Sequence, residues 1–580
     1  MRLLTPAVLL AVLASCSGRE DPVNEAAPES EVPIPPVLPV LEVTAPARAS
    51  WFADGFDVVG SGSAGDAALD ALTLNSEDRE LGSDGSFSIA HTAAPGIAVV
   101  GTRLTDVDGE RAVDGRGVHV GPVRAPGEVI ANAIGLHMHD SLLDDDSPDM
   151  DDFAGVMEAV IESPGFGAFL AAGPPIEQGG VTITIEDFSV DYADVDILPY
   201  DGKLEIDIYM YGVESDFHAT GSLVDTDGQM TMDELVMNMD VTIANNSSGI
   251  VVDVPFAYAS IDGFEWSADD FPSWMTDVLA DTVQYSIEQS LENKSKELVG
   301  DLLGDTLSSF AVDLTFADGE IDLSMALASV EVISDGLVLW MDGSVEAAIG
   351  MTLPEGAGSL TTPGAPPDLP LSGARPFNVV IDDDFINQAL FAFWHSGALT
   401  GWSFLGLELQ LMTGEPLAPP LGPVDRAIMG LQLPPVLTVP VDGVGVDVSM
   451  GEFWFQITRE DGEQIDASLN LRIAGELVTT DDGISIQLDN RPAKVLVHAG
   501  IMEAPATLDP GDLASLFRLA TPTLMGKASS AFPSFPAPAI PLGEFIDVDA
   551  LDGVEWNLAD LEHEMREDGW VVLRGGVTTD

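Results

Sequence analysis

The sequence predicts a β-rich α+β protein in which a small β-sandwich precedes two similar, elongated units. Each unit is expected to be a bent antiparallel sheet wrapped around a long helix. Three observations support this prediction: long runs with the two-residue period of a strand, two long segments with the period of a helix, and a repeat of this order on either side of a proline-rich connector.

The connector covers residues 353–376 and contains six prolines, which exclude a regular helix and a central strand. Directly after it, a helix is predicted from Asp382 to Ser396, with three aspartates where a helix N-terminus favours negative charge and Gly397 as its C-cap. Its apolar face is expected to carry Ile386, Leu390, Phe393 and Trp394.

The segments before the connector recur in the same order after it. An amphipathic segment at residues 128–143 that is expected to be a first helix, alternating strands, a second long helix at 274–310 and closing strands come first. The helix at Asp383, strands at 436–497, a second helix at 512–531 and closing strands near Val577 follow. We therefore expect a first barrel over residues 124–352 and a second barrel over residues 377–580.

The long helix of the first half is the expected cover for its sheet. Apolar residues recur on it every four positions, at Met275, Leu279, Val283, Ile287 and Leu291. At about 1.5 Å per residue it could be on the order of 50 Å long, so the sheet it covers should be elongated. Leu513, Leu516, Phe517 and Leu524 mark the second helix of the second half, with a kink expected at Pro522.

Charge and hydropathy set limits on the partners of this chain. Among 580 residues there are 97 acidic and 21 basic ones, a formal charge of -76, yet the mean hydropathy is +0.21. Acidic and apolar residues must therefore lie on opposite faces of the same elements. Such a chain has no basic surface with which to bind nucleic acid, so nucleic acid is excluded as a partner.

The N-terminus carries a targeting motif. Arg2 precedes an apolar run at residues 3–13, which is too short to span a bilayer, and Leu13-Ala14-Ser15-Cys16 follows. This pattern resembles a bacterial lipoprotein signal, which implies removal of residues 1–15 and a diacylglycerol on the sulfur of Cys16, the only cysteine. An ordinary secretory signal with an incidental cysteine is the alternative. Ser17 after the cysteine resembles a signal for sorting to the outer membrane. This signal is compatible with either the periplasmic or the outer face of that membrane.

Residues 16–41 are acidic, proline-rich and free of aromatic residues, and we expect them to be a flexible tether. Residues 42–123 contain short alternating strands separated by Gly/Asp turns and resemble the immunoglobulin-like sandwiches that bacterial surface proteins use as spacers. Within them, residues 60–65 match GxGxxG, but the segment that follows is too short for a crossover helix and strand. A dinucleotide site is therefore not expected.

Three stretches resemble the bactericidal/permeability-increasing protein family, also called tubular lipid-binding proteins: the helix at residues 383–397, the connector before it, and the return at residues 532–577. The resemblance covers residues 128–577 and implies two lipid-binding barrels joined in a boomerang, with an apolar pocket in each half. The candidate lining residues are Met275, Leu279, Val283, Ile287, Leu291, Ile386, Leu390, Phe393, Trp394 and Leu516. The family's animal members usually carry a disulfide that this chain cannot form. The basic tip of its endotoxin-binding members is also missing, which favours neutral or zwitterionic lipids.

No catalytic or metal-binding motif is found in the sequence. HExxH and GxSxG are absent, and His137 and His139, two positions apart, would face different sides of a helix. The aspartates at 144–152 and the segment 225–228 could bind calcium, but neither has the spacing of a calcium loop, so a solvated loop and a hairpin turn are expected.

The sequence therefore predicts a lipid-anchored, non-enzymatic protein of the bacterial outer envelope that carries or scavenges lipids or other apolar molecules. No cofactor and no metal site are expected. A long acyl chain gains about 0.8 kcal/mol per buried methylene, so such a site needs no polar motif. One alternative is a structural or adhesive surface protein, stabilised by calcium and without a pocket. Another is a hydrolase, which would depend on unassigned carboxylates.

Overall fold

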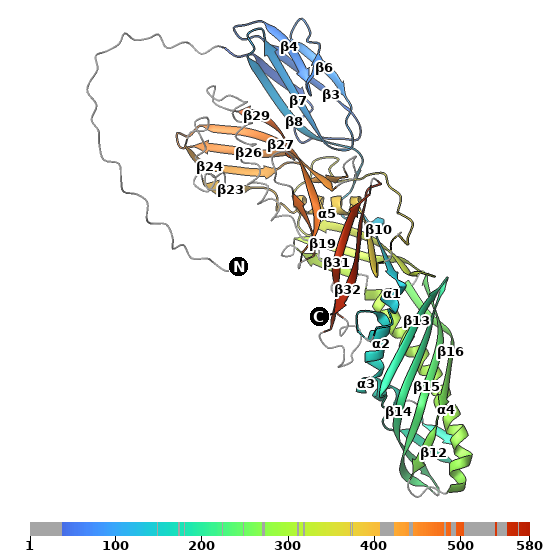
Figure 1. The fold of residues 1–580 in the computed structure, drawn as a ribbon. Helices are drawn as coiled ribbons and strands as arrows, with labels where there is room; N and C mark the ends of the chain where they lie inside the picture. The colour runs from blue at the N-terminus through green and yellow to red at the C-terminus, as the bar shows by residue number, and fades with distance from the viewer. Residues whose placement is uncertain are drawn as a thin grey trace, which may run out of the picture.

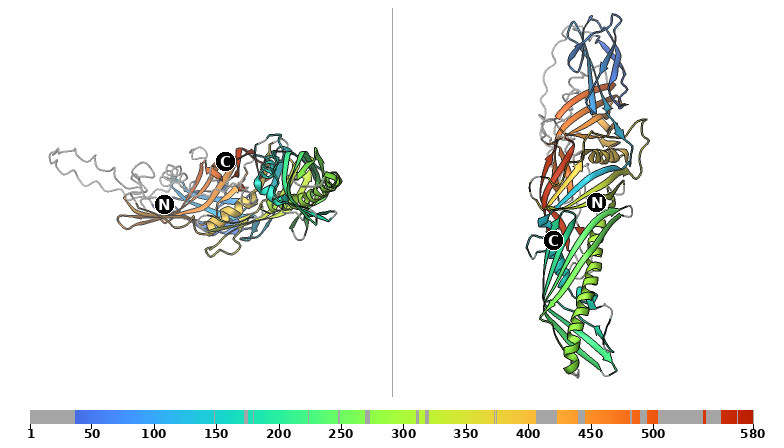
Figure 2. Two further views of the ribbon diagram at one scale, coloured as in Figure 1. Left: turned by 90° about the horizontal axis from the view of Figure 1, so that it is seen from below. Right: turned by 90° about the vertical axis from the view of Figure 1, so that its right-hand side faces the viewer.

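The computed structural model describes residues 37–579 with internal gaps, the longer of which are 406–422, 504–539 and 542–553. Figure 1 shows an elongated molecule in which the N-terminal sandwich lies at one end and the lobe formed by β12–β16 and α4 at the other. A second lobe and a central sheet lie between them (Figures 1 and 2). The predicted signal peptide, Cys16 and most of the predicted tether lie outside the described residues.

The N-terminal sandwich consists of two sheets, with strand orders β1-β3-β6 and β2-β8-β7-β4-β5. Its strands are β1 (Val40–Ala45), β2 (Trp51–Phe52), β3 (Phe56–Ser63), β4 (Leu69–Leu74), β5 (Glu77–Arg79), β6 (Ser86–His91), β7 (Gly96–Asp106) and β8 (Arg111–Val120). The GxGxxG segment begins within β3, and no helix follows it. A Cβ on Gly60 would lie 2.4 Å from the carbonyl oxygen of Glu42, so the need for close strand packing explains this glycine.

The central sheet joins the two halves of the chain and has the strand order β18-β19-β20-β10-β22-β32-β31-β30. The first four strands are β18 (Val312–Phe316), β19 (Ile321–Ile333), β20 (Gly336–Ala347) and β10 (Ile130–His139). The last four are β22 (Phe377–Asp382), β32 (Trp570–Thr579), β31 (Glu555–Met565) and β30 (Ile540–Pro541). The first strand of each half, β10 or β22, lies at the centre of the sheet, and the last three strands of that half extend outward from it. The two halves of the sheet are therefore related by an approximate two-fold axis between β10 and β22. The predicted repeat is thus visible in this sheet.

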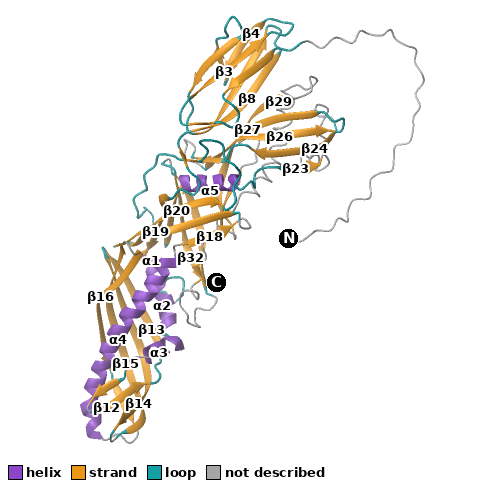
Figure 3. Ribbon diagram, turned by 180° about the vertical axis from the view of Figure 1, so that it is seen from behind, coloured by secondary structure: helices purple, strands orange, loops and turns teal. Residues whose placement is uncertain are grey.

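The first lobe is a curled antiparallel sheet with helices along it, and α4 runs along its length (Figure 3). Its strands are β11 (Ile176–Gln178), β12 (Val181–Ile185), β13 (Tyr192–Tyr200), β14 (Lys203–Gly221), β15 (Asp225–Asn246), β16 (Gly249–Asp262) and β17 (Glu265–Ala268). Its helices are α1 (Asp140–Leu143), α2 (Phe153–Ile161), α3 (Pro164–Ala171) and α4 (Ser273–Ser309). The predicted long helix is therefore present, with bounds within about one residue of those expected.

The second lobe is also a curled antiparallel sheet, with strand order β23-β24-β26-β27-β28 and with β25 and β29 paired to it. Its elements are α5 (Asp383–His395), β23 (Trp402–Leu405), β24 (Val424–Leu431), β25 (Val436–Thr438), β26 (Val446–Arg459), β27 (Gln464–Thr480), β28 (Gly483–Leu488) and β29 (Val495–Glu503). Its second predicted helix, at 512–531, lies outside the described residues. Within the connector, β21 (Ser359–Leu360) pairs with β9 (Val123–Arg124).

Two local predictions were wrong. Residues 128–143 are mostly strand β10 rather than a helix, with only α1 at their end, because this segment lies between two partner strands in the central sheet. Residues 225–228 lie within β15, opposite residues 217–220 of β14, rather than in the hairpin turn.

Helix α5 lies where the second lobe, the central sheet and the sandwich meet. Asp382 caps its N-terminus by accepting from the Asp384 N–H, and Gly397 follows its C-terminus with φ +92°, as predicted. Every residue from Asp383 to Trp394 is buried, so the prediction of a single apolar face was too narrow. Polar anchors fix this buried helix. The Asn387 side chain donates to the Leu437 carbonyl at 3.0 Å and accepts from its N–H at 2.8 Å.

Replacing Asn387 by alanine should lower the free energy of unfolding by about 3 kcal/mol. The substitution leaves both backbone groups of Leu437 without partners in a buried place, and each unsatisfied group costs about 1–3 kcal/mol. Urea unfolding followed by tryptophan fluorescence measures the change. As a matched control, Gln289→Ala on the exposed side of α4 should change the stability by less than about 0.5 kcal/mol. Equal effects of the two substitutions would contradict this role for Asn387.

The sandwich packs onto the second lobe through β7 and β8, which contact β25, β26, β27 and β29. At the centre of this interface, Glu452 is fully buried and accepts from the Gly117 N–H at 2.5 Å and from Arg48 Nη1 at 3.2 Å. Arg48 also pairs with Asp114. This network spans about four hundred residues of sequence, and it places the sandwich against the half of the chain that is farther from it in the sequence.

An aromatic contact lies in the same region. The rings of Trp51 and His119 stack with their centres 4.2 Å apart, and Trp51 meets Phe391 of α5 edge to face. His119 has no exposed surface, and neither ring nitrogen has a hydrogen-bond partner among the described residues. Burial lowers the pKa of His119 to about 4.

The contribution of His119 to the stability of the protein should therefore fall as the pH falls below about 6.5. His119 is neutral in the folded protein down to about pH 4 but takes up a proton in the unfolded chain below about pH 6.5, so acid favours unfolding. Between about pH 7 and about pH 5 this residue should account for a loss of about 2 kcal/mol. Urea titrations of wild type and His119→Phe, which keeps an aromatic ring against Trp51, give the difference. The exposed variant His563→Gln should keep the wild-type pH dependence, and an unchanged dependence in His119→Phe would contradict the assignment.

Candidate functional site

The interior of the first lobe is the largest apolar core among the described residues. Alternate residues of the long strands point inward and are buried, while their neighbours are polar or acidic and face outward. The buried apolar residues of β14 and β15 are Leu204, Ile206, Ile208, Met210, Val213, Phe217, Ala219, Met230, Met232, Leu235, Met237, Met239, Val241 and Ile243. Five of these fourteen are methionines, whose flexible side chains adapt to irregular apolar surfaces.

Helix α4 contributes the other side of this interior. Val283, Ile287 and Leu291 are 0–4% exposed and belong to the same apolar core as the strands, as do Val299 and Leu303 farther along the helix. The predicted stripe on this helix is therefore turned inward where it is described. The side chains of Met275 and Leu279 lie outside the described residues.

The ten candidate lining residues are not brought together into one site. Ile386, Leu390, Phe393 and Trp394 lie on α5, in the separate core of the second lobe. Trp394 also donates from Nε1 to the Leu431 carbonyl at 3.0 Å, so it anchors a strand. Leu516 lies outside the described residues.

The edge of β16 is closed by side chains of α4 rather than by another strand. The N–H groups of Ile261 and Ala259 donate to Glu288 and Glu292 at 3.3 and 3.4 Å, and Gln284 donates to the Ile261 carbonyl at 3.1 Å. Backbone groups at a sheet edge require such partners when they are turned away from water. The helix therefore takes the place of the next strand.

The opposite edge, along β13, is closed in the same way. The N–H group of Ala193 donates to Glu162 at 2.9 Å and that of Val195 to Glu158 at 3.0 Å, both on or beside α2. The N–H group of Ile197 donates to Asp144 at 3.1 Å. Both edges of the curled sheet are thus capped by carboxylates.

The spacing of these carboxylates matches the spacing of the strand. Glu158 and Glu162, like Glu288 and Glu292, are four residues apart, which is about 6 Å along a helix. Alternate N–H groups of a strand are about 6.6 Å apart. Because each helix runs antiparallel to the strand beside it, its two glutamates meet two successive N–H groups of that edge. The sequence analysis did not predict this role. Two like charges four residues apart on one helix face repel each other, so such a pair indicates a hydrogen-bond partner on another element.

Burial changes the titration of the acidic groups along this edge. Burial raises the pKa of Glu158, with added repulsion from Asp194 and Glu162 and an opposing contribution from the Val195 N–H. Asp152, which caps α2 by accepting from the Gly155 N–H at 2.7 Å, is 1% exposed, and burial raises its pKa to about 7. The predicted solvated loop is therefore a structured cap at this aspartate.

The outer surface beside the α4–β16 edge carries exposed aromatic side chains. Phe256 and Tyr258 on β16 are 51% and 50% exposed, and Tyr285 on α4 is 58% exposed. Phe256 and Tyr258 are two apart on a strand and so share its outer face. An aromatic surface thus lies next to the line along which α4 meets the sheet.

Three groups of side chains among the described residues bring donor atoms within 4.8 Å of one another: His139, Asp140 and Asp335; Asp144, Asp146 and Asp196; and Asp382, Asp383 and Asp384. In the third group burial raises the pKa of Asp383 to about 8, while Thr362 Oγ1 donates to this carboxylate at 2.6 Å. Arg124 pairs with Asp384 at 3.4 Å.

No helix in the described part of the chain combines the length and the apolar character that crossing a membrane requires.

No protein-family model and no curated protein matches this sequence. Solved structures that are similar include a lipopolysaccharide binding protein, with 12% identity and a TM-score of 0.41 over 77% of this chain and 99% of that chain. P47 from Clostridium botulinum A2 shows 10% identity and a TM-score of 0.23 over 77% and 97%. Takeout 1 from Epiphyas postvittana shows 13% identity and a TM-score of 0.17 over 26% and 86%. Likeness at this level assigns this chain neither a family nor a ligand.

Removing the carboxylate of Glu158 should loosen the β13 edge. In Glu158→Ala the Val195 N–H loses its acceptor, so its amide should exchange with deuterium at least about tenfold faster, the equivalent of about 1.4 kcal/mol of local opening. Hydrogen–deuterium exchange resolved by mass spectrometry measures this in peptides that cover β13. Glu331→Ala, at an exposed position on β19, is the control and should leave the exchange of β13 unchanged. Unchanged exchange in Glu158→Ala would show that the carboxylate does not hold this edge.

Proposed function

We propose that this protein binds a long-chain apolar or amphipathic molecule in the first lobe, between α4 and the curled sheet. The observation that supports this most is the way the lobe is closed. Its interior is apolar and rich in methionine, and α4 is joined to the β16 edge by side-chain hydrogen bonds of 3.1–3.4 Å.

This closure gives a physical route for entry. Separating two paired strands would break a continuous ladder of backbone bonds, whereas lifting α4 from β16 breaks a few side-chain bonds of about 0.5–1.5 kcal/mol each. The freed glutamates return to water at the surface. Apolar side chains of Val283, Ile287 and Leu291 would then contact the ligand in place of their present neighbours.

The exposed aromatic residues beside this line support the same direction of entry. Phe256, Tyr258 and Tyr285 combine apolar rings with, in the tyrosines, a polar tip, which suits the boundary between water and lipid. With its surplus of acid the protein would be repelled by anionic surfaces, so neutral or zwitterionic lipids are the proposed ligands. Anchoring through Cys16 at a bacterial outer membrane and membership of the tubular lipid-binding proteins belong to this proposal.

The full chain with Cys16→Ser, purified in soluble form and examined by native mass spectrometry, should carry lipid adducts that are removed by delipidation. A fluorescent fatty acid or phosphatidylcholine should then bind the delipidated protein. A protein that carries no adduct and binds neither probe would overturn the proposal and favour a structural surface protein.

Filling the interior should abolish this binding. Met237→Trp enlarges an inward side chain of β15, so the probe should bind at least about tenfold more weakly, corresponding to about 1.4 kcal/mol. Val236→Trp places the same ring on the outer face of the same strand and serves as the matched control. Equal probe affinities of the two folded variants would exclude this interior as the binding site.

A further inference from the structure

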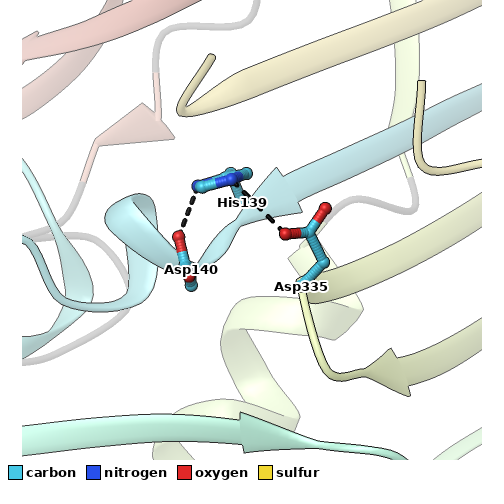
Figure 4. A group of neighbouring side chains, drawn as sticks. All are labelled: His139, Asp140 and Asp335. Atoms are coloured by element: carbon cyan, nitrogen blue, oxygen red, sulfur yellow. Dashed lines mark ion pairs between the residues drawn. The ribbon is translucent and has the colours of Figure 1, made fainter. Parts of the chain in front are cut away.

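His139, Asp140 and Asp335 meet at the junction between the central sheet and the first lobe (Figure 4). His139 is the last residue of β10, Asp140 begins α1, and Asp335 lies in the turn between β19 and β20. The three side chains thus come from three elements, one of which is about two hundred residues away in sequence from the other two. Their exposed fractions are 17%, 51% and 47%, so solvent reaches the cluster.

The two ring nitrogens of His139 face different carboxylates. Nδ1 lies 2.5 Å from Asp140 Oδ1 and 3.2 Å from the Ser141 hydroxyl and accepts from the Ser141 N–H at 3.3 Å, whereas Nε2 lies 3.5 Å from Asp335 Oδ1. A charge-assisted hydrogen bond would be about 2.7–2.9 Å long. Nε2 and Asp335 are therefore close but are not joined by such a bond.

Backbone hydrogen bonds hold this arrangement in place. The Asp140 N–H donates to the Asp335 carbonyl at 3.1 Å, and the His139 N–H donates to the Pro376 carbonyl at 3.0 Å. The Asp335 carbonyl is also 3.2 Å from Nε2 of His137. Because Nδ1 of His137 lies 3.3 Å from the Asn378 amide nitrogen, both of its ring nitrogens are engaged. His137 therefore supports the turn and is not a free ligand.

The equivalent junction of the second half contains a basic side chain beside its carboxylates, which the junction of the first half lacks among the described residues. By the symmetry of the central sheet, Asp383 corresponds to Asp140 and Gly569 to Asp335, because the Asp383 N–H donates to the Gly569 carbonyl at 2.9 Å. There the carboxylates have a protein cation, Arg124, beside Asp384. In the described part of the chain, neither Asp140 nor Asp335 pairs with a lysine or an arginine.

We propose that this junction binds a divalent transition-metal ion of the zinc class. Nε2 of His139 and the carboxylate of Asp335 are the ligands, and water completes the coordination. With the ion bound, Nδ1 carries the proton and donates to Asp140 instead of accepting from the Ser141 N–H, and a carboxylate at this position orients a metal-binding imidazole. An imidazole in the donor set selects zinc, cobalt or nickel over calcium and magnesium, which prefer oxygen alone.

Such an ion would link the end of β10 to the turn between β19 and β20, at the end of the central sheet where the chain enters α1. Only the structure shows that His137 and His139 lie close together. Two residues apart on strand β10 they lie on one face, with ring centres 6.1 Å apart, whereas the predicted helix would have separated them.

Titration of the chelator-treated full chain with zinc chloride by calorimetry, and with cobalt chloride by visible absorption, tests the proposal. One equivalent should bind to the wild type, with a cobalt spectrum that indicates nitrogen and oxygen ligands, and a large excess of calcium should not displace it. His139→Ala and Asp335→Asn should each weaken binding by at least about tenfold, and Asp140→Asn should weaken it by about tenfold.

His218→Ala is the matched control, since His218 also lies between two aspartates, at 2.6 Å from Asp227 and 3.4 Å from Asp225, but on the exposed β14–β15 hairpin. It should leave the high-affinity equivalent unchanged. Asp335→Asn, half exposed in a turn, keeps the test open if His139→Ala fails to fold. Displacement of zinc by calcium, loss of binding in His218→Ala, or wild-type affinity in Asp335→Asn would each overturn the proposal. None of these outcomes depends on lipid binding.

Discussion

The first lobe depends on hydrogen bonds from strand-edge N–H groups to helix carboxylates. A curled sheet that does not close on itself leaves two rows of backbone donors without partners, and these rows normally invite further strands. Here Glu158 and Glu162 cap the β13 edge while Glu288 and Glu292 cap the β16 edge. The match between four helical residues and two strand residues makes this possible. The sheet can therefore stay open while its edges are satisfied.

This device also gives part of the acidic surplus a structural role. Carboxylates that accept from backbone donors stabilise the fold, whereas the outward acids of β14 and β15 keep the wet face of the same strands hydrated. A charge of -76 would otherwise oppose compaction through self-repulsion. Composition alone cannot separate these two uses, because the partner of each glutamate is a backbone group on a distant strand.

Sequence periodicity predicted those elements whose own residues determine them. Helix α5 begins and ends where its aspartates and Gly397 predict, and the long strands alternate as expected. Residues 128–143 were misassigned because their apolar residues fit both periods, and only pairing with β20 and β22 decides between them. That error also hid the shared face of His137 and His139. The contact of Arg48 with Glu452 could not be predicted, since no local pattern relates residues so far apart.

The two halves differ in how their helices are held, and this difference bears on where the molecule can open. In the second half α5 is buried on all sides, with Asn387 and Trp394 bonded to strands and Trp51 of the sandwich against it. In the first half the counterpart of α5 is the four-residue α1, and α4 is joined at the β16 edge through side chains that end near solvent. Moving α5 would disturb its contacts with the second lobe, the central sheet and the sandwich, whereas moving α4 disturbs the core of the first lobe. The first lobe is therefore the part in which the proposed ligand would enter at the smaller cost in free energy.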